Sequence, residues 1–200
     1  MRIAVALLSG ALIFGGQIFA QNKVEVADLA HHPIEADFAP GGRLELHLRA
    51  GEIHIVGSDD GKITVHVGGK RGSDSTDIRA HFDSFARSGR LNVSDGPDGD
   101  VTITVSVPRH TELQAHVSAG NVDIQGITGS KDIELLAGNL TIGVGAPADY
   151  FRVKASVTTG NIDATPFGES RGGLFRSFEK TGHGKYKLVA HVGAGNLTFR

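Results

Sequence analysis

The sequence predicts an all-β fold in which short strands and Gly-Asn turns form a β-solenoid or β-helix-like stack. Three observations favour this class. Apolar and polar residues alternate over most of the chain, glycine contributes 28 of the 200 residues, and one strand–turn–strand unit occurs five times. The glycine share is about twice the usual one, and repeats spaced by about 20 residues are typical of solenoids. A β-sandwich of short strands is the alternative architecture.

The first 20 residues predict a secretory signal peptide. Arg2 is their only charged residue, residues 3–14 are apolar except for Ser9 and Gly10, and Ala20 precedes a polar segment. A positive start, a short apolar region and a small residue at the cleavage point are typical of such signals. The apolar region is too short to span a bilayer comfortably. We therefore expect an exported protein, in the periplasm or at the cell surface or outside it, with no transmembrane segment after signal removal.

Residues 21–42 contain no copy of the repeat and are expected to form an N-terminal linker or cap. Residues 43–200 are expected to form a single β-repeat domain. Period-2 alternation predicts strands at residues 44–48, 53–55, 63–67 and 100–107. Pro108 ends the last of these strands because it has no amide hydrogen for a sheet. Residues 78–86 are compatible with either a short helix or a strand.

Each repeat consists of alternating apolar residues, a small residue, a glycine, a polar residue and further alternation. The five copies are residues 46–53, 115–122, 133–140, 155–162 and 190–197. The turn glycines, which are expected to have a positive φ, are Gly51, Gly120, Gly138, Gly160 and Gly195. One unit is too small to bury its own apolar face, so neighbouring units must stack on it. Stacking would align Asn121, Asn139 and Asn161 in a ladder of side-chain amides.

These segments carry a resemblance to a known family. Residues 101–108 and the Gly-Asn repeats of residues 113–163, together with residues 46–57 and 182–199, resemble the "putative adhesin" family. Its members are exported bacterial β-strand-repeat domains of unknown function. The resemblance covers most of the chain from about residue 43 to the end. It implies a β-helix-like solenoid that is secreted or located in the cell envelope, without established catalysis, and it assigns no functional residues.

Composition excludes several classes of function. The 20 Lys and Arg residues against 22 Asp and Glu residues give a net charge of −2, which offers no basic surface for nucleic acid. The lack of cysteine excludes disulfides, thiolate-bound metals and thiol catalysis. Residues 168–172 fit the G-x-S-x-G pattern, but the strand and helix that a nucleophile elbow needs are not predicted around them.

We therefore predict a non-enzymatic protein with no catalytic, cofactor-binding or metal-binding residues and no cofactor. Its expected role is a putative adhesin or cell-envelope binding scaffold. The outward carboxylates that a hydrolase would need are scattered over different repeats, at Glu45, Asp123, Glu134 and Asp163. A β-helix polysaccharide-active enzyme and a purely structural envelope-stress component are the alternatives.

A histidine row is the most specific feature of the predicted outer face. His47, His116 and His191 occupy the same outward position in three repeats, where Glu134 and Ser156 stand in the other two. If the repeats stack in register, these side chains form a polar ladder. We expect a solvated polar face; binding of a divalent metal or a response to pH is the alternative.

The partner is expected to be an envelope or extracellular protein or a glycan. It would bind either to an outward strand ladder or to residues 165–181, which are expected to form a loop because they are the longest insertion between repeats.

Overall fold

The protein is all-β, as the sequence predicts. The computed structural model describes residues 7–14, 17–69, 78–94 and 101–200. The strands are β1 (Leu7–Phe14), β2 (Gln17–Val26), β3 (Ile34–Asp37), β4 (Arg43–Leu48), β5 (Glu52–Ser58), β6 (Lys62–Gly69), β7 (Arg79–Phe85), β8 (Ser88–Ser94), β9 (Val101–Pro108), β10 (Glu112–Gln125), β11 (Lys131–Ile142), β12 (Tyr150–Ala164), β13 (Glu169–Thr181) and β14 (Tyr186–Phe199). Two 3-10 turns, η2 (Pro147–Asp149) and η3 (Thr165–Phe167), flank β12.

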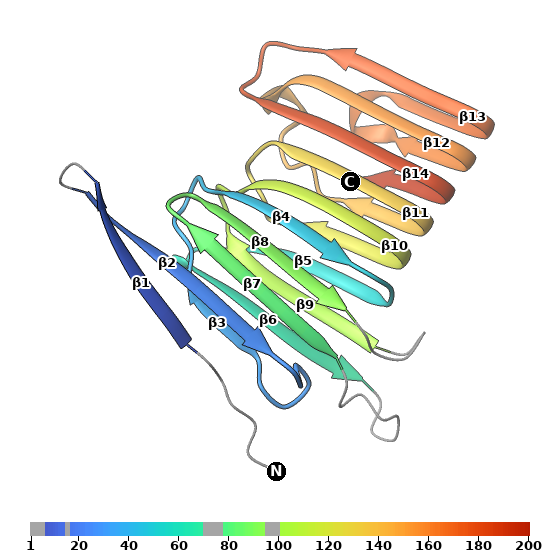
Figure 1. Cartoon of the computed structure of the whole chain (residues 1–200). Helices are drawn as coiled ribbons and strands as arrows, with labels where there is room; N and C mark the ends of the chain where they lie inside the picture. Colours follow the sequence, from blue (N-terminus) through green and yellow to red (C-terminus); the bar gives the residue numbers. More distant parts are fainter. Residues whose placement is uncertain (1–6, 15–16, 70–77, 95–100) are drawn as a thin grey trace.

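The long strands bend in the middle and contribute to two layers. Residues 112–117 of β10 pair with β4, whereas residues 121–125 pair with β5. The bend between them contains Gly120. Figure 1 shows β10, β11, β12 and β14 doubling back at this point, so that their halves form two facing layers. Alternate residues of each half are buried, and the core therefore lies between the layers.

The repeats are parallel and in register, but they do not follow one another in chain order. The spatial order is β4, β10, β11, β14 and β12, so the last repeat lies between the third and the fourth. The spatial order of the repeats therefore differs from their order in the chain at this point. The reason is that β13 pairs antiparallel with one edge of β12, and β14 fills the space that remains between β12 and β11.

Pairing at the two ends of the stack differs from pairing in its middle. Toward one end, β7 pairs with β8 and β6 pairs with β9, both antiparallel, and β12 pairs antiparallel with β13 at the other. Parallel stacking is the feature expected of a solenoid, and antiparallel pairing is typical of a sandwich. The structure combines both within one sheet that does not close.

The N-terminal segment divides at the predicted cleavage point. Strands β1 and β2 form a hairpin, but β2 pairs with β7 only through residues 21–26. Residues 7–20 therefore make no pair with β7, and removal of the predicted signal peptide leaves every β2–β7 pair in place. Residues 21–42 contribute strands and the buried side chains of Ile34 and Phe38 to the core. Within the described residues, no helix is long and apolar enough to cross a membrane.

A column of glycines fixes the stacking of the bends. Gly51, Gly120, Gly138, Gly195 and Gly160 lie one above another, with φ between 117° and 140°. Such φ values favour glycine. A Cβ on Gly138 would overlap the carbonyl oxygen of Gly120, and a Cβ on Gly195 would overlap that of Gly138. The positive φ expected from the sequence is confirmed, and the close approach of the backbones gives a second reason for glycine.

The asparagines that follow these glycines form a hydrogen-bonded ladder. Asn139 Nδ2 donates to Asn121 Oδ1 at 2.9 Å, and Asn196 Nδ2 donates to Asn139 Oδ1 at 2.8 Å. Asn161 Nδ2 then donates to Asn196 Oδ1 at 3.0 Å. The predicted ladder is therefore present, but Asn196 stands between Asn139 and Asn161 because β14 lies between β11 and β12.

One cation is buried in the aliphatic core. Lys131 is 1% exposed, and its Nζ donates to the carbonyl oxygen of Gly129 at 3.2 Å and to the hydroxyl of Tyr150 at 2.8 Å. The Tyr150 hydroxyl in turn donates to the carbonyl oxygen of Val144. Within the described part of the chain, Lys131 has no carboxylate partner. Burial therefore lowers the pKa of Lys131 to about 8 and raises the pKa of Tyr150 to about 12.

The glycine column predicts the effect of adding one methyl group. Gly138→Ala should lower the free energy of unfolding by about 2–5 kcal/mol, because it combines an unfavourable φ with overlap against backbone atoms that cannot move aside independently. Gly61→Ala is the matched control, since a Cβ there meets no atom within 4 Å and should change stability by less than about 0.5 kcal/mol. Urea unfolding measures both values, and equal stabilities would contradict the stacked-glycine account.

The lowered pKa of the buried Lys131 predicts that the free energy of unfolding rises at alkaline pH. Because its pKa is lower in the folded state than the usual value of about 10.4, the unfolded chain binds the proton more strongly between pH 8 and 10. The free energy of unfolding should therefore rise across this window, and below pH 8 the full penalty of about 3 kcal/mol remains. Above pH 10 the raised pKa of Tyr150 acts in the opposite direction, because only the unfolded tyrosine then ionises.

The test compares the wild type with Lys131→Met. This variant should be more stable at pH 7 by about 1–2 kcal/mol, since the lost hydrogen bonds offset part of the relieved penalty. Its stability should also be nearly flat between pH 8 and 10. Urea unfolding at each pH measures the stability of both proteins. If the two stabilities change with pH in the same way, Lys131 does not cause the pH dependence.

Candidate functional site

Outward side chains form a continuous polar row across the first layer. The strands of this layer pair in register, so equivalent residues of neighbouring strands lie side by side. Since side chains alternate between faces along each strand, every member of this row points away from the core. The row consists of His81, Asn92, His47, His116, Glu134, His191 and Ser156.

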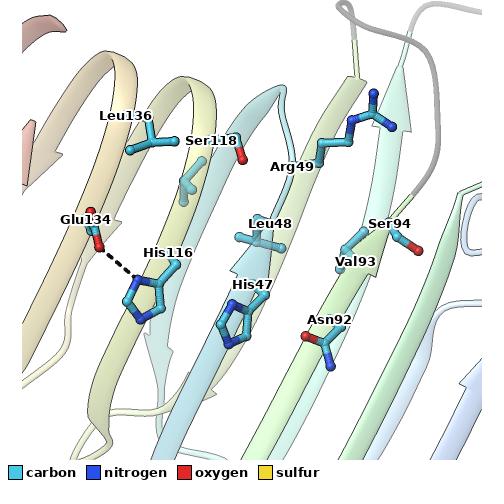
Figure 2. A pocket seen from close by; sticks show the side chains of 11 residues that line it. His47, Leu48, Arg49, Asn92, Val93, Ser94, His116, Ser118, Glu134 and Leu136 are labelled. Carbon is cyan, nitrogen blue, oxygen red and sulfur yellow. Dashed lines mark hydrogen bonds and ion pairs between the residues drawn. The ribbon is translucent and has the colours of Figure 1, made fainter. Parts of the chain in front are cut away.

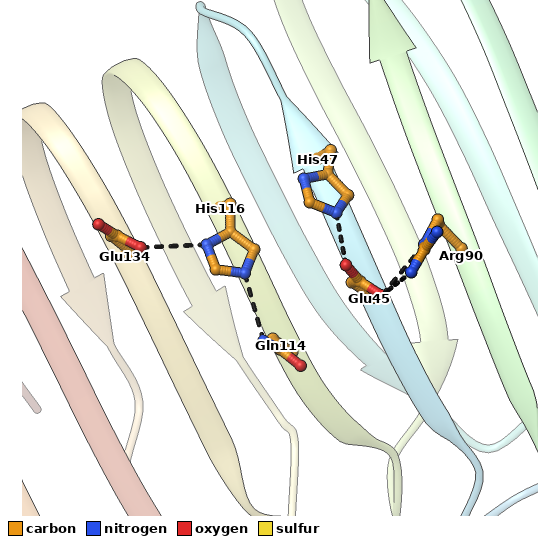
Figure 3. Close-up of polar contacts among 6 residues, drawn as sticks. All are labelled: Glu45, His47, Arg90, Gln114, His116 and Glu134. Carbon is orange, nitrogen blue, oxygen red and sulfur yellow. Dashed lines mark hydrogen bonds and ion pairs between the residues drawn. The ribbon is translucent and has the colours of Figure 1, made fainter.

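Two histidines lie at the centre of this row and stack on each other. The rings of His47 and His116 have their centroids 5.2 Å apart and an interplanar angle of 16°. His47 Nε2 lies 2.6 Å from Glu45 Oε1, and His116 Nδ1 lies 3.2 Å from Glu134 Oε2. Figure 3 shows both contacts and the further contact between His116 and Gln114. The stacked rings are therefore held at their edges by polar neighbours, and both side chains remain partly exposed to solvent.

Glu45 connects the histidines to the adjacent strand. Its Oε2 accepts hydrogen bonds from Arg90 Nε at 3.1 Å and Nη2 at 2.8 Å, while its Oε1 contacts His47. The hydrogen bonds from Arg90, and then the one from His47, lower the pKa of Glu45. This carboxylate is therefore ionised at neutral pH and contacts His47 on one side and Arg90 on the other.

A groove of about 390 Å³ opens beside the stacked pair. It is lined from four strands, β8, β4, β10 and β11, and from Arg49 directly after β4. Figure 2 shows Glu134, His116, His47 and Asn92 in order along it, with Leu136 and Arg49 farther along the strands. Leu136 is 57% exposed, although Leu135 before it is fully buried. The groove thus combines a polar row with one exposed apolar side chain.

Several polar side chains that line the groove have no partner among the described residues. Within the described part of the chain, the side chains of Arg49, Asn92, Ser94 and Ser118 make no hydrogen bond or ion pair. Arginine supplies a fork of N–H donors, asparagine a donor and an acceptor, and serine a hydroxyl that does both. Together with the Glu134 carboxylate, they offer donors and acceptors within one groove.

The structure brings together only part of the predicted histidine set. His47 and His116 are neighbours, whereas His191 lies beyond Glu134 and contacts Ser156 Oγ through Nδ1 at 2.8 Å. Among the described residues, no group of three or more His, Asp or Glu side chains is placed to hold a metal ion.

The predicted binding loop at residues 165–181 consists of the 3-10 turn η3 and the strand β13. After η3, the chain forms β13 and pairs antiparallel with β12 along its whole length, so the expectation of a loop is wrong. The small and charged residues at the start of β13 give no clear strand pattern. This segment forms a strand because it pairs with the edge of β12. A second cavity of about 330 Å³ lies next to this segment. Its lining is largely apolar and includes Phe167 of η3 and Tyr150 and Val153 of β12.

The other candidate carboxylates lie on the second layer and have partners of their own. Both oxygens of Asp123 accept hydrogen bonds from Arg200 at 2.8 Å. Asp163 accepts hydrogen bonds from Thr165, which lower its pKa. The two aspartates share one register row, but strands β11 and β14 separate them. The structure therefore does not bring Asp123 and Asp163 together.

The sequence interpretation missed the residues that make the groove. Two residues after the histidine position, the repeats carry Arg49, Ser118 and Leu136 at equivalent outward positions. A leucine at an outward position in one repeat was a detectable sign of a binding surface. Asn92 and Ser94 had no such signal, because they belong to β8, which carries no copy of the repeat and reaches the site by pairing with β4.

The Glu45 network predicts a pH-dependent contribution to stability. A lowered carboxyl pKa stabilises the fold above the usual glutamate value of about 4.3, and this contribution is lost as the pH falls below it. Glu45→Gln should therefore lower the free energy of unfolding by up to about 1 kcal/mol at pH 7, and the difference should vanish near pH 3. Glu112→Gln, which removes a more exposed contact with Arg43, is the control. An equal loss at both pH values would exclude the ionic origin.

The known proteins to which this chain is similar are solved structures of low sequence identity. No family model and no curated protein matches the sequence. The chain is similar to the crystal structure of a putative cell adhesion protein from Clostridium sporogenes, with a TM-score of 0.49 and 13% identity over 84% of this chain and 99% of that one. It is also similar to a putative adhesin from Bacteroides fragilis, with a TM-score of 0.24 and 10% identity over 86% and 99%. The names of both neighbours are of the kind that the repeat resemblance implies.

Proposed function

We propose that this protein is an exported, non-enzymatic binding scaffold of the cell envelope or cell surface, of the adhesin type. In this proposal, the stacked repeats are a β-solenoid-like support, and the groove beside His47 and His116 holds the partner. The observation that carries the proposal is the set of four polar side chains, Arg49, Asn92, Ser94 and Ser118, that are gathered around one groove and are unpaired among the described residues.

The support beneath the groove is suited to binding. Its residues project from four neighbouring strands whose inward side chains, such as Leu46 and Ala115, are fully buried. A ligand therefore meets side chains whose backbone is already fixed, which reduces the entropy lost on association. A site of this kind needs no induced change of the sheet.

Carboxylate chemistry favours binding over hydrolysis. Glycoside hydrolysis needs one carboxyl group with a raised pKa as general acid, whereas the pKa values of Glu45 and Asp163 are both lowered by hydrogen bonds. The G-x-S-x-G segment follows η3 and begins β13, so it lacks the strand-to-helix turn of a nucleophile elbow. These features support a non-enzymatic role.

The proposal predicts loss of partner retention when the groove is altered. The immobilised full chain should retain a component of an envelope fraction from the source cells. The double variant Arg49→Ala/His116→Ala should retain at least tenfold less, because it removes a free guanidinium and half of the stacked pair. His54→Ala, an outward histidine of the second layer that contacts Glu52 at 3.3 Å, is the matched control and should bind like the wild type.

Three outcomes would contradict the proposal. Equal retention by the double variant would exclude the groove as the binding site. Failure of the wild type to retain any component would favour a purely structural role, and turnover of a glycan panel by the wild type would favour an enzyme. Circular dichroism and urea unfolding of each variant establish that the fold is intact.

A further inference from the structure

We propose that the groove binds a neutral polysaccharide chain that lies across β8, β4, β10 and β11 along the polar row. This inference rests on the proposed function and specifies the chemical class of its partner. It follows from the kinds of side chain in the groove, from their arrangement, and from what the groove lacks among the described residues.

The unpaired groups match the hydroxyls of sugars. A sugar hydroxyl both donates and accepts hydrogen bonds, so its site needs donors and acceptors close together. Arg49 and Asn92 offer planar groups that can bond two hydroxyls at once, Ser94 and Ser118 offer hydroxyls, and Glu134 offers acceptor oxygens beside its contact with His116.

The groove also offers exposed apolar surface on which a sugar ring can pack. The C–H face of a pyranose is a small apolar surface, and Leu136 supplies one isolated exposed apolar side chain at the groove. The stacked rings of His47 and His116, whose side chains are 42% and 37% exposed, supply a second surface at the level of the polar row. A ligand with one apolar face and a polar rim fits between them.

The charges favour a neutral chain. Among the described residues that line the groove, Arg49 is the one cation without a partner. Glu134 is the one carboxylate, and only its Oε2 contacts His116. The other nearby charges, Glu45 and Arg90, neutralise each other. A polyanion would meet Glu134 and a polycation would meet Arg49, so neither sign is favoured along the row.

A folded protein partner fits the groove less well. Protein interfaces bury about 800 Å² on each side and depend on aromatic anchors in apolar pockets. The described lining of this groove includes no Phe, Tyr or Trp, and Leu136 is its one strongly exposed apolar side chain.

The geometry of the row suits a polymer. Neighbouring strands lie about 4.8 Å apart, and polar side chains continue on both sides of the groove, to His81 at one end and to Ser156 at the other. A ligand with repeating hydroxyl groups can therefore make similar contacts at successive strands, and its affinity increases with the number of strands that it covers.

The test separates polysaccharide from protein in the retained envelope material. Periodate cleaves vicinal diols of sugars, whereas a protease digests polypeptides. Retention of envelope material by the full chain should fall at least tenfold after periodate and persist after protease. It should also persist in about 1 M salt, where surface ionic contacts are screened. Retention that survives periodate and is lost after protease would overturn this inference while leaving the proposed function intact.

Variants test the apolar contact independently. Leu136→Ala should weaken binding of the periodate-sensitive material about fivefold to tenfold, as expected for the loss of one apolar contact. Leu174→Ala on β13 is the matched control, because Leu174 is 61% exposed and lies outside the groove. Equal affinity of both variants, or loss of binding in high salt, would contradict a neutral chain packed on Leu136. Failure of the wild type to retain any material would contradict the proposed function itself.

Discussion

The close approach of backbones at the glycine column is the constraint on which the rest of the structure depends. At each bend, the carbonyl oxygen of one glycine occupies the space that a Cβ of the next would need, as between Gly120 and Gly138. This contact allows one register between neighbouring repeats, because a shift by one residue would place a side chain in that space. Once the register is fixed, the inward residues meet in the core and the outward residues form rows. The asparagine ladder and the histidine row are consequences of the same alignment.

Much of this arrangement could be predicted from the sequence because it is local. Period-2 alternation predicted a strand at residues 100–107, and the described part of this range lies in β9. The recurring Gly-Asn pair identified the bends and their positive φ. The same alternation placed His47 and His116 on the outer face at equivalent positions, so a register that aligns the glycines also aligns the histidines. Residues 78–86, compatible with helix or strand by pattern alone, form β7 because the edges of β2 and β8 are available on either side.

The remaining features depend on competition for strand edges, which leaves no local signal. Repeats four and five have nearly the same pattern, and it does not specify that β14 separates β11 from β12. Residues 169–181 are a strand because they cover the free edge of β12, not because of their alternation. The groove has the same origin, since Asn92 is brought beside His47 by pairing between strands 45 positions apart in sequence. A functional site of this kind becomes visible only when the long-range pairing is known.

The position of β14 has a consequence for the order in which the stack can assemble. Strand Tyr186–Phe199 pairs with β11 on one side and with β12 on the other. Before this strand is in place, the stack consists of two parts without a common edge. Contacts between residues distant in sequence form slowly, so the joining of the two parts waits for these pairings. Loss of β14 would therefore divide the stack instead of shortening it.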